Sequence, residues 1–199
     1  MTAPDAARAL AETRAWVEQA VIGLNLCPFA KAVQVKGLVR YFCSAAREPA
    51  ALRDDLRREM QHLAAAPVDE IETTLLVHPW VLTDFLDFND FLDEADALLV
   101  ELGLDGVLQV ASFHPGYRFA GTEADDITNA TNRSPHPTLH LLREASIDRA
   151  VAACPEAQTL VAANLRTLRA LGAEGWARLQ AEILRSAARA VSAENPRAR

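Results

Sequence analysis

The sequence has few of the features that mark secreted or membrane proteins. Three of its 199 residues are cysteines, Cys27, Cys43 and Cys154, and no CxxC spacing occurs. An odd number of unclustered cysteines argues against a disulfide framework and favours a reducing cytoplasm. No apolar run approaches the roughly 20 residues that a membrane helix needs. The N-terminal segment carries Asp5 and Glu12 and lacks the pattern of a signal peptide. We therefore expect a cytoplasmic protein that does not act at a membrane.

Positive charge is also scarce. Twenty Lys and Arg residues stand against 27 Asp and Glu residues, which gives a net charge of -7. Because a phosphate backbone attracts a basic surface, we expect no nucleic-acid partner. The Walker A, GxGxxG and GxSxG motifs are absent, so the sequence indicates no particular cofactor. Half of the residues are hydrophobic, which is enough to bury the core of one compact domain over residues 1–199.

Strand-like and helix-like segments alternate in the middle of the chain. Segments rich in β-branched and aromatic residues predict strands over 38–43, 73–77 and 107–113. Apolar residues spaced by three and four positions predict helices over 48–63 and 84–102. Helical crossovers of this length join parallel neighbours. The expected fold is therefore α/β, a small, mainly parallel sheet flanked by helices. An α+β sandwich is the alternative, with antiparallel strands within 32–35 or 139–142.

Helices are expected at both ends of the chain. Leu10, Val17, Val21 and Leu24 share one face of a first helix, which Pro28 terminates. Residues 157–192 form an Ala-, Leu- and Arg-rich extension in which Gly172 and Gly175 interrupt the helical period. We interpret this extension as a helical hairpin that packs on the domain.

Between Phe113 and Thr138 neither period is present. Irregular segments of this length are uncommon in compact domains and are often functional. The segment contains groups suited to binding and proton transfer, namely His114, Tyr117, Arg118, Asn132, Arg133 and His136. The alternative interpretation is a solvent loop whose Asn and Asp side chains bond to their own backbone.

The expected topology places this segment at a site-forming edge. If the strands are parallel, Cys43, His78 and His114 all lie at the carboxyl ends, outside which α/β proteins bind ligands. We predict that His114 is a general acid or base and that Tyr117 donates or positions a proton. The predicted substrate-binding residues are Arg118, Arg133, Asn132 and His136, with the two guanidinium groups holding an anion.

Cys27 and two histidines suggest further chemistry. Cys27 lies just beyond the first helix, where it is either a nucleophile activated by a nearby cation or a buried structural thiol. His136 and His140 are four residues apart, and they would face one side if Pro137 opened a helix. That spacing occurs in helical zinc sites, so both are candidate metal ligands.

Three blocks of the sequence together resemble a known family. They are NLCPFAK at 25–31, SFHPGYRFAG at 112–121 and NRSPHPTLHLLRE at 132–144. Their joint occurrence is similar to that in an uncharacterised, mainly bacterial family, catalogued as a domain of unknown function. The resemblance runs from about Trp16 to about Ala152. It implies that these blocks are the positions to test, and it supplies no mechanism.

Two functional hypotheses follow from these observations. The first is an enzyme that acts on a small anionic substrate through the His, Tyr and Arg side chains of 114–136, with Cys27 as a possible participant. The second is a module that binds a metabolite or an acidic peptide without turning it over, or a His-ligated metalloprotein. Both hypotheses require the segment after the third strand to meet the Cys27 block in a common cavity.

Overall fold

The computed structural model describes residues 5–153 and 159–194, so Cys154 lies outside the described residues. At its centre is a four-stranded sheet in the order β1-β2-β4-β3. The strands are β1 (Val39–Cys43), β2 (Thr73–Val77), β3 (Leu108–Phe113) and β4 (Thr138–Arg143). β1 and β2 are parallel, whereas β4 runs antiparallel to both of its neighbours. The α/β prediction is confirmed, with a mixed sheet.

β4 accounts for one of the two antiparallel strands considered above. The strand within 139–142 exists, and it lies between β2 and β3. The segment 32–35 instead belongs to the short helix α2 (Ala30–Val35). β1 is parallel to β2, and β4 is antiparallel to both β2 and β3. The strands β1, β2 and β3 therefore all point the same way. Their carboxyl ends therefore share one edge, as the sequence predicted.

Two helices cover one face of the sheet. They are α3 (Pro49–Ala65) and α4 (Phe85–Glu101), and each lies within two residues of the helix predicted there. Their apolar stripes meet strand residues such as Leu76 and Leu139 in a first hydrophobic core. The side chain of Asp84 caps α4 by accepting the backbone N–H groups of Leu86 and Asp87, which fixes where that helix begins.

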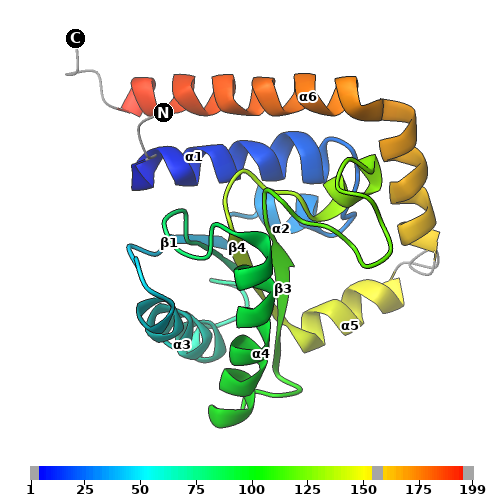
Figure 1. Cartoon of the computed structure of the whole chain (residues 1–199). Helices are drawn as coiled ribbons and strands as arrows, with labels where there is room; N and C mark the ends of the chain where they lie inside the picture. Colours follow the sequence, from blue (N-terminus) through cyan, green and yellow to red (C-terminus); the bar gives the residue numbers. More distant parts are fainter. Residues whose placement is uncertain (1–4, 154–158, 195–199) are drawn as a thin grey trace.

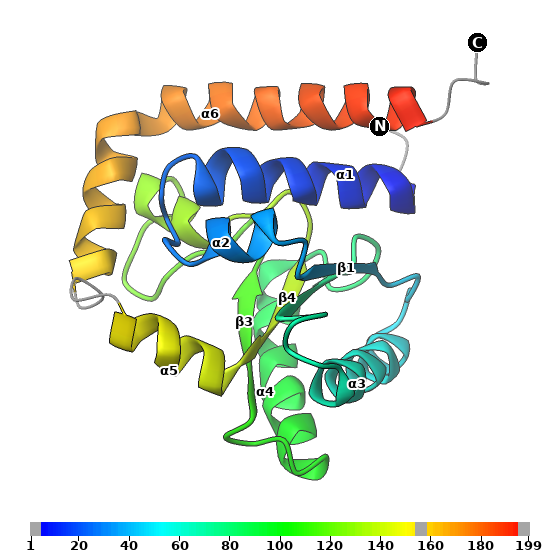
Figure 2. The ribbon, with the colours of Figure 1, turned by 180° about the vertical axis from the view of Figure 1, so that it is seen from behind.

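The N- and C-terminal helices cover the opposite face. α1 (Ala6–Trp16) continues into a π-helical turn, η1 (Val17–Ile22), and α6 (Leu160–Glu194) runs alongside α1 (Figures 1 and 2). A second core joins them to the sheet through Trp16, Leu75 and Ile183. Leu75 and Leu76 serve different cores because successive strand residues point to opposite faces.

The expected C-terminal pair of helices takes the form of one bent element. α6 departs from helical geometry at Gly172, where φ is 67° and ψ is 172°. Glycine adopts this positive φ without the steric penalty that a Cβ atom brings. The two segments meet at a corner instead of lying side by side, and only the second follows α1 (Figure 1). The first segment descends towards α5 (Glu144–Ala153).

No helix in the described part of the chain is both long and apolar enough to cross a membrane.

Candidate functional site

The segment between β3 and β4 is held in shape by its own side chains. It contains a 3-10 helix, η2 (Ile127–Asn132), which packs against α6. Asn129 accepts the backbone N–H of Phe119 at 3.0 Å and donates to the carbonyl of Glu123 at 2.8 Å. Asn132 donates to the carbonyl of Ser112 at 3.1 Å. Such contacts were expected if the segment is a loop whose Asn and Asp side chains bond to the local backbone. Asn129 and Asn132 therefore stabilise the conformation of the loop.

Arg133 connects two distant parts of this segment. Its Nε donates to the carbonyl of Tyr117 at 3.1 Å, and its Nη2 donates to the carbonyl of Ala124 at 2.6 Å. Burial lowers the pKa of Arg133, while the carboxylate of Asp126 opposes that shift. Nη1 makes no hydrogen bond within the described part of the chain, which leaves its donors for a ligand.

His136 forms a buried pair with a residue of α1. Its Nε2 lies 2.6 Å from Oε2 of Glu12, and the other carboxylate oxygen accepts Nε of Arg8 at 2.8 Å. The side chain of Glu12 is only 4% exposed. Burial alone would raise the pKa of Glu12, but the hydrogen bonds from His136 and Arg8 lower it overall. The carboxylate is therefore charged at neutral pH, and it fixes the orientation of the imidazole ring.

A small cavity adjoins Arg133. Its volume is about 170 Å³, and it lies between the loop and the second segment of α6. Its lining combines two indole rings with loop residues: Trp16, Pro115, Arg133, Ser134, Pro135, Trp176, Gln180, Ile183 and Leu184. His136 is the next residue after Pro135, and Glu12 lies one helical turn before Trp16. The cavity therefore has a cation and aromatic walls, and the Glu12–His136 pair is close in sequence to its lining without itself being part of that lining.

His114 lies elsewhere, on the α4 side of the sheet. It is 2% exposed, and its ring packs against Phe85 and Phe88 with centroid distances of 5.6 and 5.1 Å. Nδ1 accepts the backbone N–H of Gly116 at 3.0 Å, whereas Nε2 has no hydrogen bond of normal geometry. Burial lowers the pKa of His114, although the backbone of Leu82 and Thr83 acts in the opposite direction. The ring is thus neutral and enclosed.

His78 has a matching environment at the end of β2. It is fully buried, it stacks on Phe88, and its Nδ1 lies 3.0 Å from the carbonyl of Val81. Burial lowers its pKa to about 4. The histidines of the two His-Pro pairs that follow β2 and β3 therefore flank Phe88 and contact the turn between β2 and α4, which includes Leu82 at a positive φ of 53°.

Tyr117 and Arg118 occupy the outer part of the loop. The ring of Tyr117 contacts Phe85 and Phe119 at centroid distances of 5.2 and 5.0 Å. It therefore lies in the same aromatic cluster as His114. Arg118 is exposed, and its side chain makes no hydrogen bond or ion pair within the described residues. The two arginines predicted to hold one anion are thus in different environments.

Cys27 lies on the opposite side of the sheet from His114. It follows Leu26, whose side chain belongs to the second core and whose carbonyl accepts Nδ2 of Asn164 in α6 at 2.9 Å. Phe113 also points into that core, so the next residue, His114, points to the first. The structure therefore does not bring Cys27 and His114 together. It does bring the Cys27 block near η2, because Leu26 and Ala130 share the second core.

The helix expected after Pro137 is wrong, because residues 138–143 form strand β4. His136 lies two residues before β4 and its Nε2 pairs with Glu12, so the helical arrangement that would have placed it beside His140 does not form. Nε2 of His140 bonds to Oγ1 of Thr73 at 2.7 Å, and burial lowers its pKa to about 4. Within the described ranges, no group of three or more His, Cys, Asp or Glu side chains is placed to hold a metal.

Sequence reasoning missed the partner of His136 and the walls of the cavity. Glu12 was noted only as a charge near the N-terminus. Its spacing of three and four from Ala9 and Trp16 does place it on the buried face of α1, where a carboxylate needs a partner. The two indole rings come from opposite ends of the chain, and no local pattern pairs them.

The fold and this loop define an α/β protein with a polar, aromatic-walled cavity outside the carboxyl ends of its strands. The chain belongs to the family described as a protein of unknown function (DUF1415), whose family model matches residues 8–178. No curated protein and no solved structure matches the chain.

Proposed function

We propose that the chain binds a small organic anion in the cavity beside Arg133 and transfers a proton to or from it through His136. The observation that carries this proposal is the Glu12–His136 pair, because a buried carboxylate that orients an imidazole leaves the other ring nitrogen for proton transfer. Nδ1 of His136 makes no hydrogen bond within the described residues.

The lining of the cavity supports an anion that carries an apolar group. The free donors of Arg133 suit a carboxylate or phosphate, and the rings of Trp16 and Trp176 suit a flat or apolar body. The volume of about 170 Å³ is below the range of about 300–1,000 Å³ typical of drug-sized ligands, so the ligand is small. The proposal assigns no step to His114 or Cys27, which lie away from the cavity.

Three further predicted residues support the site without contacting the ligand: Tyr117, Asn132 and Arg118. Tyr117 and Asn132 shape the loop, since the carbonyl of Tyr117 receives Arg133 and Asn132 anchors the loop to β3. Arg118 is a second cation on the outer surface, where it attracts the anion to this part of the molecule. We assign no cofactor to the site.

A binding screen tests the first half of the proposal. Benzoate, phenyl phosphate and inorganic phosphate are titrated and followed by thermal shift and calorimetry. We expect benzoate or phenyl phosphate to stabilise the protein, and Arg133→Lys to weaken binding about tenfold through loss of the paired donors. Arg149→Gln removes an exposed arginine of α5 and serves as the matched control. Binding that is equal in the two variants would contradict the assignment of Arg133.

An activity comparison tests the second half. Wild-type protein and His136→Gln are incubated with a mixture of small organic acids, and the mixture is followed by NMR. We expect the wild type alone to change a component or to exchange one of its carbon-bound protons with solvent. Stabilisation by the ligand without any such change would favour the non-catalytic binding module, whose site is the same cavity.

A further inference from the structure

A second, larger groove lies between α1 and the second segment of α6. Its volume is about 540 Å³, within the range of about 300–1,000 Å³ found for small-molecule sites. It shares no lining residue with the cavity beside Arg133. The proposed function does not use this groove.

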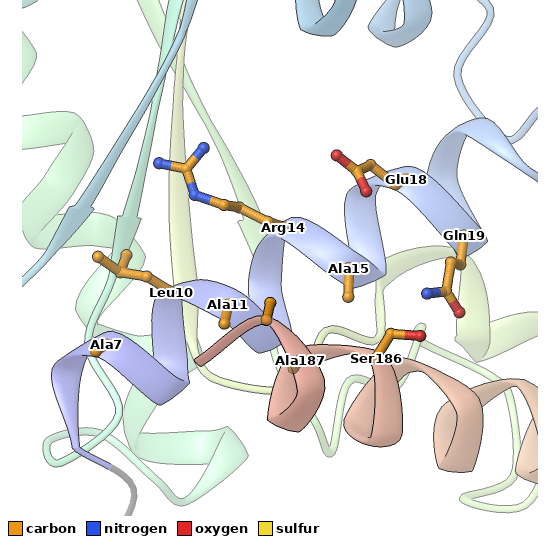
Figure 3. Close-up of a pocket in the computed structure, with 10 residues that line it drawn as sticks. Ala7, Leu10, Ala11, Arg14, Ala15, Glu18, Gln19, Ser186 and Ala187 are labelled. Atoms are coloured by element: carbon orange, nitrogen blue, oxygen red, sulfur yellow. The ribbon is translucent and has the colours of Figure 1, made fainter. Parts of the chain in front are cut away.

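The floor of the groove is apolar and formed by small side chains, and its rim is polar. Alanines line both helices, among them Ala11 and Ala187, with Leu10 beside them (Figure 3). Gln19 and Ser186 lie on the α6 side, whereas one charged side chain of α1 and one of η1 project away from α6 (Figure 3). A ligand here would contact apolar and charged surface together.

The two charged residues, Arg14 and Glu18, do not pair with each other. Side chains four residues apart on a helix ordinarily form an ion pair when their charges are opposite. No such pair joins these two residues, which are both described. The guanidinium of Arg14 instead lies 4.0 Å from the centre of the Tyr41 ring, and Oε1 of Glu18 accepts Nε2 of Gln34 at 3.1 Å.

Both charged groups are held in place by the same short network. The hydroxyl of Tyr41 donates to Oε1 of Gln34 at 2.9 Å, so the residue that stacks on Arg14 also orients the residue that binds Glu18. Glu18 itself belongs to the π-helical turn η1, an irregularity that is frequent at functional sites. The chain thereby keeps a cation and an anion separate beside an apolar floor.

Each group retains unused hydrogen-bonding capacity. The guanidinium of Arg14 makes no hydrogen bond within the described residues, and its stacking on Tyr41 leaves the in-plane N–H donors available. Oε2 of Glu18 likewise accepts no hydrogen bond from any described residue. The groove therefore presents donors for one carboxylate and an acceptor for one ammonium group.

We propose that this groove binds a zwitterionic α-amino acid with an apolar side chain. The carboxylate of the ligand binds Arg14, its ammonium group binds Glu18, and its side chain lies on the alanine floor of α1 and α6. Because both charged groups are exposed, the expected affinity is modest, with a Kd on the order of 1 mM.

Three probes that differ only in charge test the proposal. L-phenylalanine carries both charges, N-acetyl-L-phenylalanine carries only the negative one, and L-phenylalaninamide carries only the positive one. Binding to the full chain is followed by NMR chemical shifts and calorimetry. We expect L-phenylalanine to bind about tenfold more tightly than either analogue, the factor expected for one lost charge-assisted hydrogen bond.

Variants then locate the site. Arg14→Gln and Glu18→Gln should each weaken binding of L-phenylalanine about tenfold, and Arg14→Gln should leave the weak binding of L-phenylalaninamide unchanged. Arg178→Gln, an exposed arginine of α6 outside the groove, is the matched control and should bind as the wild type does. Circular dichroism and Tm confirm that each variant is folded.

Three results would overturn the proposal. They are equal binding of the three probes, no saturable binding of L-phenylalanine up to about 10 mM, and equal affinities in Arg14→Gln, Glu18→Gln and the control. These outcomes are independent of the benzoate titration, because the two cavities have no lining residue in common.

Discussion

Arg133 combines a structural and a binding role in one side chain. Two of its nitrogens close the loop by donating to carbonyls at positions 117 and 124, and the third makes no hydrogen bond to any described residue. Only a planar guanidinium offers donors in these fixed directions, whereas an ammonium group is a compact point charge. The loop geometry and the anion site therefore depend on arginine specifically, not on positive charge.

We expect Arg133→Lys to destabilise the protein by about 0.5–1.5 kcal/mol, because the half-buried carbonyl of Tyr117 loses its donor. The loop should also become more susceptible to limited proteolysis. Urea unfolding and a protease time course measure both effects. Arg118→Lys, an exposed arginine of the same loop, should change neither, and an unfolding free energy for Arg133→Lys equal to that of this control would refute the structural role.

Glu12 is the second residue whose role depends on burial. Glu12→Gln keeps the shape of the side chain but removes the charge that holds His136 and Arg8, so we expect a loss of about 1–3 kcal/mol at pH 7. Since the folded-state pKa of Glu12 is lowered, its stabilising effect is present above its unfolded pKa and is lost as the pH falls through the folded value.

Urea unfolding of the two proteins from pH 7 to pH 3 measures this effect. The difference between wild type and Glu12→Gln should shrink as the pH falls below about 4. Asp54→Asn alters an exposed carboxylate of α3 that forms no hydrogen bond or ion pair within the described residues, and it is the control. A difference that grows towards acid pH would contradict the buried pair.

At the scale of elements, the strand ends and β4 place histidines where protonation is unfavourable. Burial lowers the pKa values of both His78 and His140 to about 4. His78 contacts the turn that precedes α4. His140 in β4 hydrogen-bonds to Thr73 in the neighbouring strand β2. Both rings must stay neutral for the sheet and the turn to keep their packing.

The free energy of unfolding should therefore fall as the pH drops from about 6.5 to about 4. At His78 and His140 the unfolded chain, with histidine pKa values near 6.5, binds up to two more protons than the folded chain in this window. These two residues contribute at most about 2.7 kcal/mol per pH unit to the slope. His140→Gln should reduce it, while His62→Gln, at an exposed position of α3, should leave it unchanged. A flat profile would show that the rings are hydrated.

At the scale of the whole molecule, the second core connects both chain ends to the sheet. Trp16 from α1, Leu75 from β2 and Leu168 and Ile183 from α6 belong to it. The loop joins the same core through Ala130 in η2. Helix α6 is therefore not an independent appendage, and the cavity beside Arg133 exists only when α6 is docked.

Ile183→Ala should destabilise the whole protein by about 2–4 kcal/mol, because Ile183 is 2% exposed and its removal leaves a void. We expect tryptophan fluorescence and far-UV circular dichroism to report one coincident transition at a lower urea concentration. Leu184→Ala changes the neighbouring residue, which is 43% exposed, and should have little effect. Separate transitions for the two probes would show that α6 unfolds on its own.

The sequence by itself determined the elements that depend on local periodicity. Strand 73–77, the helices of 48–63 and 84–102 and the break at Gly172 all follow from side-chain spacing or from the special backbone of glycine. The common edge of the three parallel-pointing strands also followed, since crossover length limits topology. The loop was recognised as unusual because neither period describes it.

Only the tertiary structure decided which residues meet. The residues that follow Pro137 form a strand and not a helix, because β4 is stabilised by partners on both sides, which local propensity does not include. Cys27 and His114 lie on opposite sides of the sheet. Successive strand residues point to opposite faces, so Phe113 points into the second core, on the side of Cys27, and His114 points into the first. Glu12 and His136 are 124 positions apart, and their pairing depends on how α1 packs, a property of the whole chain and not of any local segment.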